Sequence, residues 1–418
     1  MKPHAAYVPR ALFALCLLVA STATAAAQAP AQLLNQEPAR FQIKSAVLGE
    51  ERTVLVRVPA GYERNQQRFP VLYMTDGDAH ILHTTATVQF LARNGRMPEM
   101  IVVGITNTDR TRDLTPTRVE TLPGNPNVRF PTSGGADKFL KFIETELIPH
   151  VEKQYRTQPF RVLAGHSLGG LFAVHAMFAR PELFNAYISV SPSLQWDNFV
   201  MTERAKQFFN ERKDYNRTLF VTLGNEPGDI GDGFQMFRDL LAKQQTANFV
   251  WQAAQMADED HGSVVLRSHY EGLRKVYDGW QLPRDPATGA VAVAGFKGVM
   301  EHYKKLSARM GYDVLPPEQV VNLMGYQHMG ARQNEEALAA FKWNVEHYPG
   351  SANVYDSLGE YYERAENKLD LALPLYAKAA SVGKQTGDPN ANLFQQNHDR
   401  VAGLLKQPAN SAAGNANQ

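Results

Sequence analysis

A strand–turn–helix passage around a glycine-flanked serine constrains this 418-residue chain more than any other feature. The strand-like run Arg161–Ala164 leads into Gly165–Gly169, which reads GHSLG, and the apolar run Leu171–Phe178 follows. The G-x-S-x-G pattern alone is common by chance, but this setting is that of a nucleophile elbow. The two glycines would remove Cβ atoms that clash where Ser167 adopts a strained backbone angle. The passage therefore predicts that Ser167 is a nucleophile, with a non-catalytic glycine-rich turn as the alternative.

From about Phe41 to Leu282, β-rich runs alternate with helical patterns. Several of these runs are continuously apolar, as expected for strands covered on both faces by helices. Helical stretches such as Gly135–Tyr155 and Gly233–Gln245 lie between them. This alternation predicts an α/β layer fold with a mostly parallel sheet. The expected strands are Thr53–Val58, Pro70–Met74, Met100–Ile105, Arg161–Ala164, Ala186–Val190, Leu219–Leu223 and Asn248–Ala253.

The pattern changes at about residues 281–298, where proline and glycine punctuate a small-residue stretch typical of a linker. Beyond it the pattern is wholly helical, and Gly325 and Phe341 are echoed by Gly359 and Tyr376 at offsets of 34 and 35 residues. Over roughly residues 316–383 this spacing resembles tetratricopeptide repeats. Two repeats are few for such an array, so we expect support from neighbouring helices or from the α/β domain. The predicted order is an export signal at 1–27, an α/β domain at 28–282, a linker at 283–297, a helical domain at 298–406 and a disordered tail at 407–418.

The N-terminus has the three parts of an export signal. Lys2 and Arg10 are basic, Ala11–Ala20 is apolar, and Ala25–Ala27 fits a cleavage site. A permanent membrane anchor is the alternative, but the apolar run is short for a bilayer span. We therefore predict a periplasmic or secreted protein with no stable membrane insertion after signal removal.

Removal of the signal would leave 41 basic against 42 acidic residues and would take away Cys16, the single cysteine. Disulfide and thiol chemistry are then excluded for the mature protein, which favours the periplasm. The balanced charge gives no reason to expect nucleic acid or an anionic membrane surface as a partner.

A serine becomes a good nucleophile when a base removes its proton. Folds built on this elbow place the acid and then the histidine downstream of the serine. His175 lies two turns into the elbow helix and cannot fold back, and His269 falls within a later helix. His261 lies in the acidic loop 256–263 after the last expected strand, so we predict that His261 is the base.

The acid is expected in the loop that follows the strand Leu219–Leu223. Glu226 is nearest the end of that strand, Asp229 is the alternative, and Asp232 is a third candidate. A serine–histidine dyad that works without an acid is the remaining alternative.

Oxyanion stabilisation requires two preorganised N–H donors. The backbone of Leu168, directly after the nucleophile, is one, and the amide of Asp78, with Gly77 adjacent, is our candidate for the other. A calcium loop would also explain the carboxylates near Asp78, but their spacing matches no full ligand set. His80 and His83 lack further ligands and are interpreted as polar groove residues, so no metal or cofactor is predicted.

Substrate contacts are expected from an aromatic side chain and a basic loop. Trp196 is predicted to line the ester site, with a core position as an equal alternative. Arg110, Arg112 and Arg118 are predicted to bind an anionic substrate, or else to be solvated surface residues.

Five motifs in order resemble the esterase D-type "putative esterase" family of α/β-hydrolases, and within it the periplasmic ferri-siderophore esterase branch. The resemblance spans about Phe41–Trp280 and implies Ser167 and His261 as catalytic. The family's carboxylate is less constant, some members of the branch are dyads, and Pro227 stands where a carboxylate is common. The motifs are Phe69–Asp78, Thr111–Thr117, Ala164–Phe172, Ser189–Trp196 and His261–Val264.

The family acts on siderophore trilactones, feruloyl or acetyl sugar esters and S-formylglutathione, and some members are acyltransferases. The resemblance thus predicts an exported serine esterase acting on a small-molecule ester, of the siderophore or carbohydrate kind. Two alternatives stay open: an acyltransferase using the same site, and a non-catalytic exported scaffold. The helical domain is expected to bind a protein or peptide partner or to form a lid.

Overall fold

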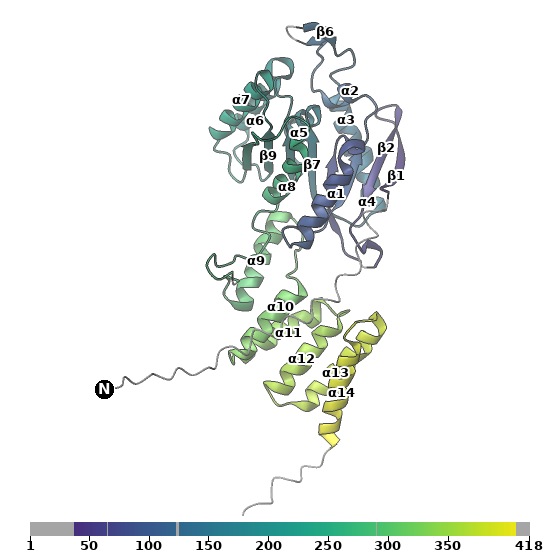
Figure 1. The fold of residues 1–418 in the computed structure, drawn as a ribbon, viewed down its shortest axis with the longest axis vertical. Helices are drawn as coiled ribbons and strands as arrows, with labels where there is room; N and C mark the ends of the chain where they lie inside the picture. The colour runs from purple at the N-terminus through teal and green to yellow at the C-terminus, as the bar shows by residue number, and fades with distance from the viewer. Residues whose placement is uncertain (1–36, 65, 123–124, 290, 407–418) are drawn as a thin grey trace, which may run out of the picture. The chain divides into compact units, whose positions relative to one another are not determined.

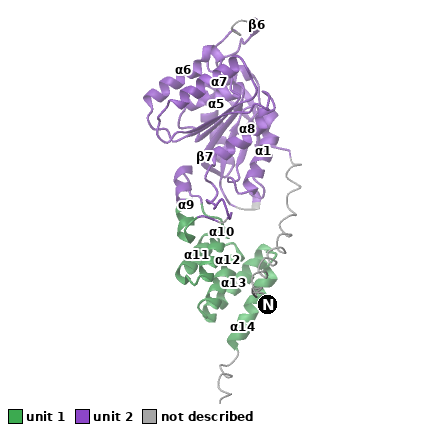
Figure 2. Ribbon diagram, turned by 60° about the vertical axis from the view of Figure 1, so that its left-hand side comes forward, with its two compact units in different colours: residues 1–35, 293–303, 315–418 green, residues 36–292, 304–314 purple. Residues whose placement is uncertain are grey.

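The computed structural model describes residues 37–64, 66–122, 125–289 and 291–406 (Figure 1). The expected export signal at 1–27, with Cys16, and the expected tail at 407–418 lie outside the described residues. The chain forms two compact units, shown in different colours in Figure 2. Of the described residues, the α/β unit comprises 37–292 and 304–314, and the helical unit comprises 293–303 and 315–406.

The α/β unit is built on a sheet of eight strands in the order β1-β2-β4-β3-β7-β8-β9-β10. β1 pairs with β2, and β2 with β4, in antiparallel fashion, whereas all the other neighbours are parallel. Parallel pairing requires crossover connections, which the helices between the strands supply. The strands are β1 (Ala39–Ser45), β2 (Glu50–Arg57), β3 (Phe69–Met74), β4 (Ile101–Ile105), β7 (Thr157–His166), β8 (Ala186–Val190), β9 (Thr218–Leu223) and β10 (Val250–Gln255).

Helices cover both faces of this sheet (Figure 1). α1 and α8 pack against each other on one face, and α2, α3, α5, α6 and α7 form a connected layer on the other. A short hairpin of β5 (Thr121–Leu122) and β6 (Asn125–Arg129) stands apart from the main sheet. The helices of this unit are η1 (Tyr62–Arg64), α1 (Gly77–Arg93), α2 (Arg110–Leu114), α3 (Ala136–Phe142), the π-helical η2 (Ile143–Leu147), α4 (Ile148–Gln154), α5 (Leu168–Ala179), α6 (Trp196–Glu211), α7 (Asp229–Ala242) and α8 (Val264–Val276).

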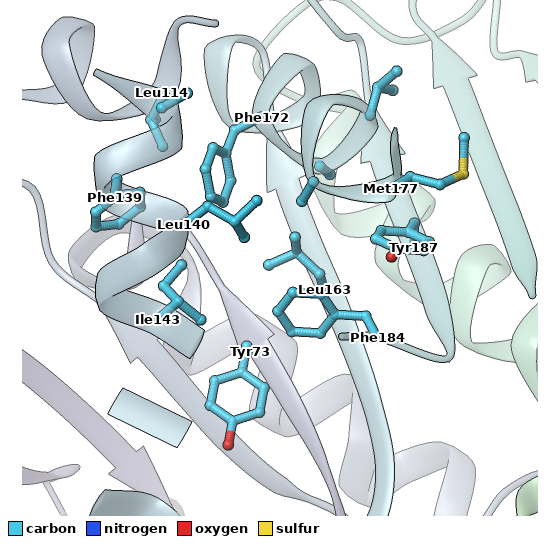
Figure 3. Close-up of a cluster of buried hydrophobic side chains, with 14 of the residues drawn as sticks. Tyr73, Leu114, Phe139, Leu140, Ile143, Leu163, Phe172, Met177, Phe184 and Tyr187 are labelled. Atoms are coloured by element: carbon cyan, nitrogen blue, oxygen red, sulfur yellow. The ribbon is translucent and has the colours of Figure 1, made fainter. Parts of the chain in front are cut away.

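The core of the α/β unit lies between the sheet and the layer that contains α3 and α5. Figure 3 shows Tyr73 of β3 and Leu163 of β7 together with Phe139 of α3 and Phe172 of α5, each at most 2% exposed. Burial of so many large apolar side chains is the main favourable term in folding. It makes the sheet a rigid platform for the loops at its carboxyl edge.

The predicted fold class is confirmed: a mostly parallel sheet with helices on both faces, followed by an all-helical region. Each of the seven expected strands is a strand of the main sheet. The sequence reading did not include β1 or the β5–β6 hairpin.

The helical unit contains α10 (Glu318–Gly330), α11 (Asn334–His347), α12 (Ala352–Arg364), α13 (Leu369–Thr386) and α14 (Ala391–Lys406), with each helix packed on the next. Close approach explains its small residues, since a Cβ at Gly325 would lie 2.6 Å from the Phe341 ring. At the echoed position, a Cβ on Gly359 would lie 3.1 Å from Tyr376. The likeness to tetratricopeptide repeats stays a prediction.

α9 (Gly295–Met310) belongs partly to each unit, because Lys304–Val314 is counted with the α/β unit. Within that unit, the Arg309 guanidinium donates to the Asp278 carbonyl, and Met310 lines a small cavity with Phe160. The chain therefore passes from one unit to the other at 292/293, within the linker expected at 283–297, and again at 303/304 inside α9 and at 314/315. None of the described helices is long and apolar enough to span a bilayer.

Candidate active site

The expected elbow is a turn of one residue between β7 and α5. Ser167 has φ 61° and ψ −115°, a conformation that L-residues rarely adopt and that concentrates at functional sites. A Cβ on Gly165 would lie 2.2 Å from the carbonyl oxygen of Gly169, and a Cβ on Gly169 would lie 2.2 Å from Thr75 Oγ1. Only glycine fits at either position, so the turn can hold Ser167 at the carboxyl edge of the sheet.

The structure brings His261 and Glu226 together. His261 lies between β10 and α8, and its Nδ1 is hydrogen-bonded to Glu226 Oε2. The other oxygen of Glu226 accepts from Ser191 Oγ at 2.6 Å and from the Gly224 amide at 3.1 Å. The Glu226 side chain is 8% exposed, so these bonds fix it firmly. With Nδ1 used in this way, Nε2 of His261 is the nitrogen that can accept a proton.

The other two acid candidates lie elsewhere. Asp229 begins α7 and lines the cavity described below, and Asp232 follows in the first turn of the same helix. Glu226 is thus the carboxylate that contacts the histidine.

A cavity of about 460 Å³ opens beside Ser167. One wall is aromatic: Phe130 meets Trp196 edge-on at 5.1 Å, and Trp196 Nε1 donates to Thr117 Oγ1 at 3.1 Å. Trp196 is 7% exposed, so it belongs to the core and to the cavity wall at once. The lining residues are Arg110, Val119, Phe130, Ser167, Leu168, Ser193, Gln195, Trp196, Asp197, Asn198, Phe199 and Asp229.

Three consecutive residues of that lining adopt a left-handed backbone conformation. Asp197, Asn198 and Phe199 have φ of 48°, 51° and 64° at the start of α6. Left-handed residues other than glycine are costly and normally occur singly. This left-handed turn (Asp197–Phe199) therefore concentrates backbone strain in the wall of the cavity.

The cation of the cavity is Arg110, and neither Arg112 nor Arg118 lines it. The Arg112 guanidinium is held by Glu50 at 2.6 Å and by Asp113 at 2.8 Å, and Arg118 pairs with Glu120 on the exposed hairpin side. Arg110 and Arg112 are two residues apart on α2, so their side chains point in different directions. Substrate binding by Arg112 and Arg118 stays a prediction.

Arg110 also contacts the elbow through hydrogen bonds. It donates to Asp76 Oδ1 at 2.6 Å and to the His166 carbonyl at 2.9 Å. Burial opposes the charge on Asp76, but hydrogen bonds from Arg110 and Asn107 outweigh it, so the pKa of Asp76 lies below its usual value. A fixed ion pair thus connects α1, α2 and β7 next to the nucleophile.

Leu168 begins α5 and lines the cavity, so its amide is a first-turn N–H without a partner inside the helix. Asp78 lies in the first turn of α1, with its side chain exposed, and is not part of the cavity lining. Its amide as second oxyanion donor stays a prediction.

The Ser167 hydroxyl lies 3.4 Å from Ser193 Oγ, a neighbour that the sequence reading did not single out. Ser191, which holds Glu226, was also missed, although both serines fall in the motif Ser189–Trp196. His80 stacks on His83 and meets His166 edge-on, and His83 meets His269. Among the described residues, no group of three or more His, Cys, Asp or Glu side chains is arranged so that it could hold a metal ion.

The model of the family described as "Putative esterase" matches residues 45–219. A siderophore enterobactin esterase of Emericella nidulans is 36% identical over 240 residues, covering 46% of this chain and 77% of that protein. The chain belongs to this esterase family. It is a carboxylic ester hydrolase of the α/β-hydrolase type.

Two further relatives agree with this assignment. The ferri-bacillibactin esterase BesA of Bacillus subtilis is 33% identical over 181 residues, which are 40% of this chain and 59% of BesA. The crystal structure of an IroE-like serine hydrolase from Shewanella oneidensis is 29% identical, with a TM-score of 0.63 over 75% of this chain and 100% of that one.

Proposed function

We propose that the protein is an exported serine esterase that cleaves siderophore esters through Ser167, His261 and Glu226. The observation that carries the proposal is the hydrogen bond between His261 Nδ1 and a Glu226 carboxylate that is buried and fixed by two further donors. A histidine oriented in this way is the base that a nucleophilic serine needs.

In the proposed reaction, Ser167 Oγ attacks the ester carbonyl while His261 Nε2 takes the hydroxyl proton. The Leu168 amide, and by prediction that of Asp78, stabilise the negative oxygen of the tetrahedral intermediate. His261 then returns the proton to the departing alcohol oxygen, which leaves an acyl group on Ser167. Water, activated by His261, attacks this acyl group and releases the acid and free Ser167.

Siderophore esters are proposed as substrates because the relatives carry that activity in their names. The cavity supports this choice: Trp196 and Phe130 offer an aromatic wall, and Arg110 offers a donor to phenolic or carbonyl oxygens. About 460 Å³ suits one acyl arm of such a molecule rather than the whole.

A hydrolysis panel with the full-length protein and its Ser167→Ala variant tests this function. The panel contains ferric and metal-free catecholate trilactones, feruloyl and acetyl sugars, and p-nitrophenyl acetate. We expect the trilactones to be turned over fastest, with ring-opened acids as products, and the variant to be at least about 10³-fold slower. Equal turnover by the variant would refute the serine mechanism. Ester exchange with added alcohol would favour an acyltransferase instead.

Export rests on residues 1–27, and its test is separate. Expressed with its own N-terminus in a Gram-negative host, the protein is expected in the periplasmic fraction, beginning at Gln28. A protein retained in the cytoplasm with Met1 in place would contradict it. A protein or peptide partner for the helical unit is likewise a proposal, carried by the sequence resemblance alone.

A further inference from the structure

His166, the residue before the nucleophile, makes a contact that takes no part in the proposed proton transfers. The His166 side chain lies within hydrogen-bond distance of the backbone of His261, with Nε2 2.7 Å from the carbonyl oxygen. The two rings also pack at a centroid distance of 4.6 Å. A carbonyl can only accept, so His166 must carry its proton on Nε2. The elbow and the base loop are therefore joined by one directed hydrogen bond.

The surroundings of His166 keep it neutral and in place. The ring of His80, on α1, meets the His166 ring edge-on at 5.7 Å. Arg110, which is paired with Asp76, donates a hydrogen bond to the His166 carbonyl. Burial, reinforced by the adjacent His261, lowers the pKa of His166 to about 4. At neutral pH the ring is thus an uncharged donor, which adds no positive charge beside the imidazolium that forms in catalysis.

A second layer of histidines supports the first. His83 stacks on His80 at 5.1 Å and contacts His269 at 5.6 Å, while Thr84 Oγ1 lies 2.9 Å from His269 Nδ1. Burial lowers the pKa of His269 well below its ordinary value. His80 and His83 lie on α1 and His269 on α8, so His80, the ring that contacts His166, is itself held by rings from both helices.

We propose that His166 is a positioning residue for the esterase reaction: its Nε2–H holds the His261 backbone and so fixes the distance between base and nucleophile. Glu226 orients the His261 ring from one end, and His166 fixes its main chain from the other. His166 directly precedes Ser167 in the chain. Its hydrogen bond to His261 therefore couples the position of the base loop to that of the nucleophile. Misplacement of a catalytic group by about 1 Å costs on the order of 100-fold in rate.

The test compares full-length wild type with His166→Phe, His166→Gln and the control His150→Phe, a histidine of α4 whose ring stacks on Phe41 of β1. Phe keeps ring volume but has no donor, whereas Gln can place an amide N–H close to the position of Nε2. With p-nitrophenyl acetate, we expect His166→Phe to lower kcat about 10- to 100-fold with KM within about twofold. His166→Gln should recover most of kcat, and His150→Phe should stay within about twofold of wild type. A His166→Phe enzyme with wild-type kcat, or a Gln variant as slow as the Phe variant, would overturn the proposal.

A measurement on the wild type guards against variants that fail to fold. Imidazole ¹⁵N NMR should show His166 as the neutral Nε2–H form from pH 8 down to about 5, assigned by the signal missing in His166→Gln. An Nδ1–H form would refute the hydrogen bond directly. The inference rests on the proposed function, yet the two fail differently: a wild type inactive on every ester counts against the function, while the NMR signal concerns His166 alone.

Discussion

The two units of this chain differ in their stabilising contacts and in where their strained backbone residues lie. The α/β unit carries a buried ion pair between Arg52 and Asp113, a partly exposed one between Arg110 and Asp76, and non-glycine residues at positive φ in its cavity wall. In the helical unit, glycines lie against aromatic rings, and the described non-glycine residues with positive φ, Arg332 and Asn367, lie in turns between helices. Violations of local rules gather at functional sites and require compensation elsewhere. The difference therefore locates the chemistry in the α/β unit independently of any motif.

The largest effect should come from the carboxylate that orients the base. Glu226→Gln keeps the shape of the side chain but can no longer hold His261 in the tautomer with a free Nε2, so kcat should fall by about 10³- to 10⁴-fold. Hydrolysis of p-nitrophenyl acetate measures it, with circular dichroism to show that the fold is intact. The matched control is Asp232→Asn, expected within about twofold of wild type. If Asp232→Asn were the slower enzyme, the acid would have been assigned wrongly.

Much of this site could be predicted because its signals are local. The glycine spacing predicted the tight turn at Ser167, and position after a strand pointed to His261 and Glu226, which the structure joins by a hydrogen bond. Arg110 could not be separated from Arg112, because that choice depends on how a five-residue helix is rotated against β2. The left-handed turn (Asp197–Phe199) has no sequence signature, since Asp and Asn are common in ordinary caps and turns.

Fold prediction failed where the signal was weak rather than absent. In β1, Phe41 and Ile43 are half-buried while Gln42 and Lys44 are exposed, the alternation expected of an edge strand. The sequence reading relied on continuously apolar runs, which suit central parallel strands, and so overlooked it.

Loss of the buried cation at Arg52 should be the largest change in stability. Arg52 is 1% exposed and contacts Asp113 at 2.6 Å and the Thr106 carbonyl at 3.0 Å. Arg52→Met leaves Asp113 with Arg112 as its one remaining cation, so we expect the α/β unit to lose about 3 kcal/mol. Differential scanning calorimetry should show one transition moving and the helical one unchanged. Arg118→Met, at an exposed pair, should cost at most about 0.5 kcal/mol, and an equal loss in both variants would contradict the argument.

A destabilising substitution in the helical unit provides the opposite test. A side chain at Gly325 would meet the Phe341 ring, so Gly325→Val should destabilise this unit by about 2 kcal/mol through overpacking. Esterase kcat at 25 °C should not change. The control is Gly330→Ala, where the added Cβ meets nothing within 4 Å. A parallel loss of activity in Gly325→Val would show that the two units are not energetically separate.

Acid should weaken the α/β unit before its carboxylates titrate. Burial lowers the pKa values of His80, His83, His166 and His269 below the ordinary 6.5. Below pH 6.5 the unfolded chain therefore binds protons that the folded unit cannot, and stability falls as pH drops. His166 alone, with a pKa of about 4, should contribute about 2 kcal/mol of loss between pH 6.5 and 4, allowing for its partial exposure. Urea unfolding at a series of pH values measures this, and a flat profile over that range would contradict it.

The smallest effect concerns two asparagines in the same backbone conformation. Asn198 has φ 51° and Asn367 has φ 53°, and both are exposed, but only Asn198 lines the cavity. A β-branched residue is strained at such a φ, so Asn198→Ile and Asn367→Ile should each cost about 1 kcal/mol. We expect KM for a trilactone to rise several-fold in Asn198→Ile and to stay unchanged in Asn367→Ile. Equal stability losses with a KM effect at Asn198 alone would mean that the same local strain serves substrate binding in one unit and chain reversal in the other. A KM effect of equal size at Asn367 would remove that distinction.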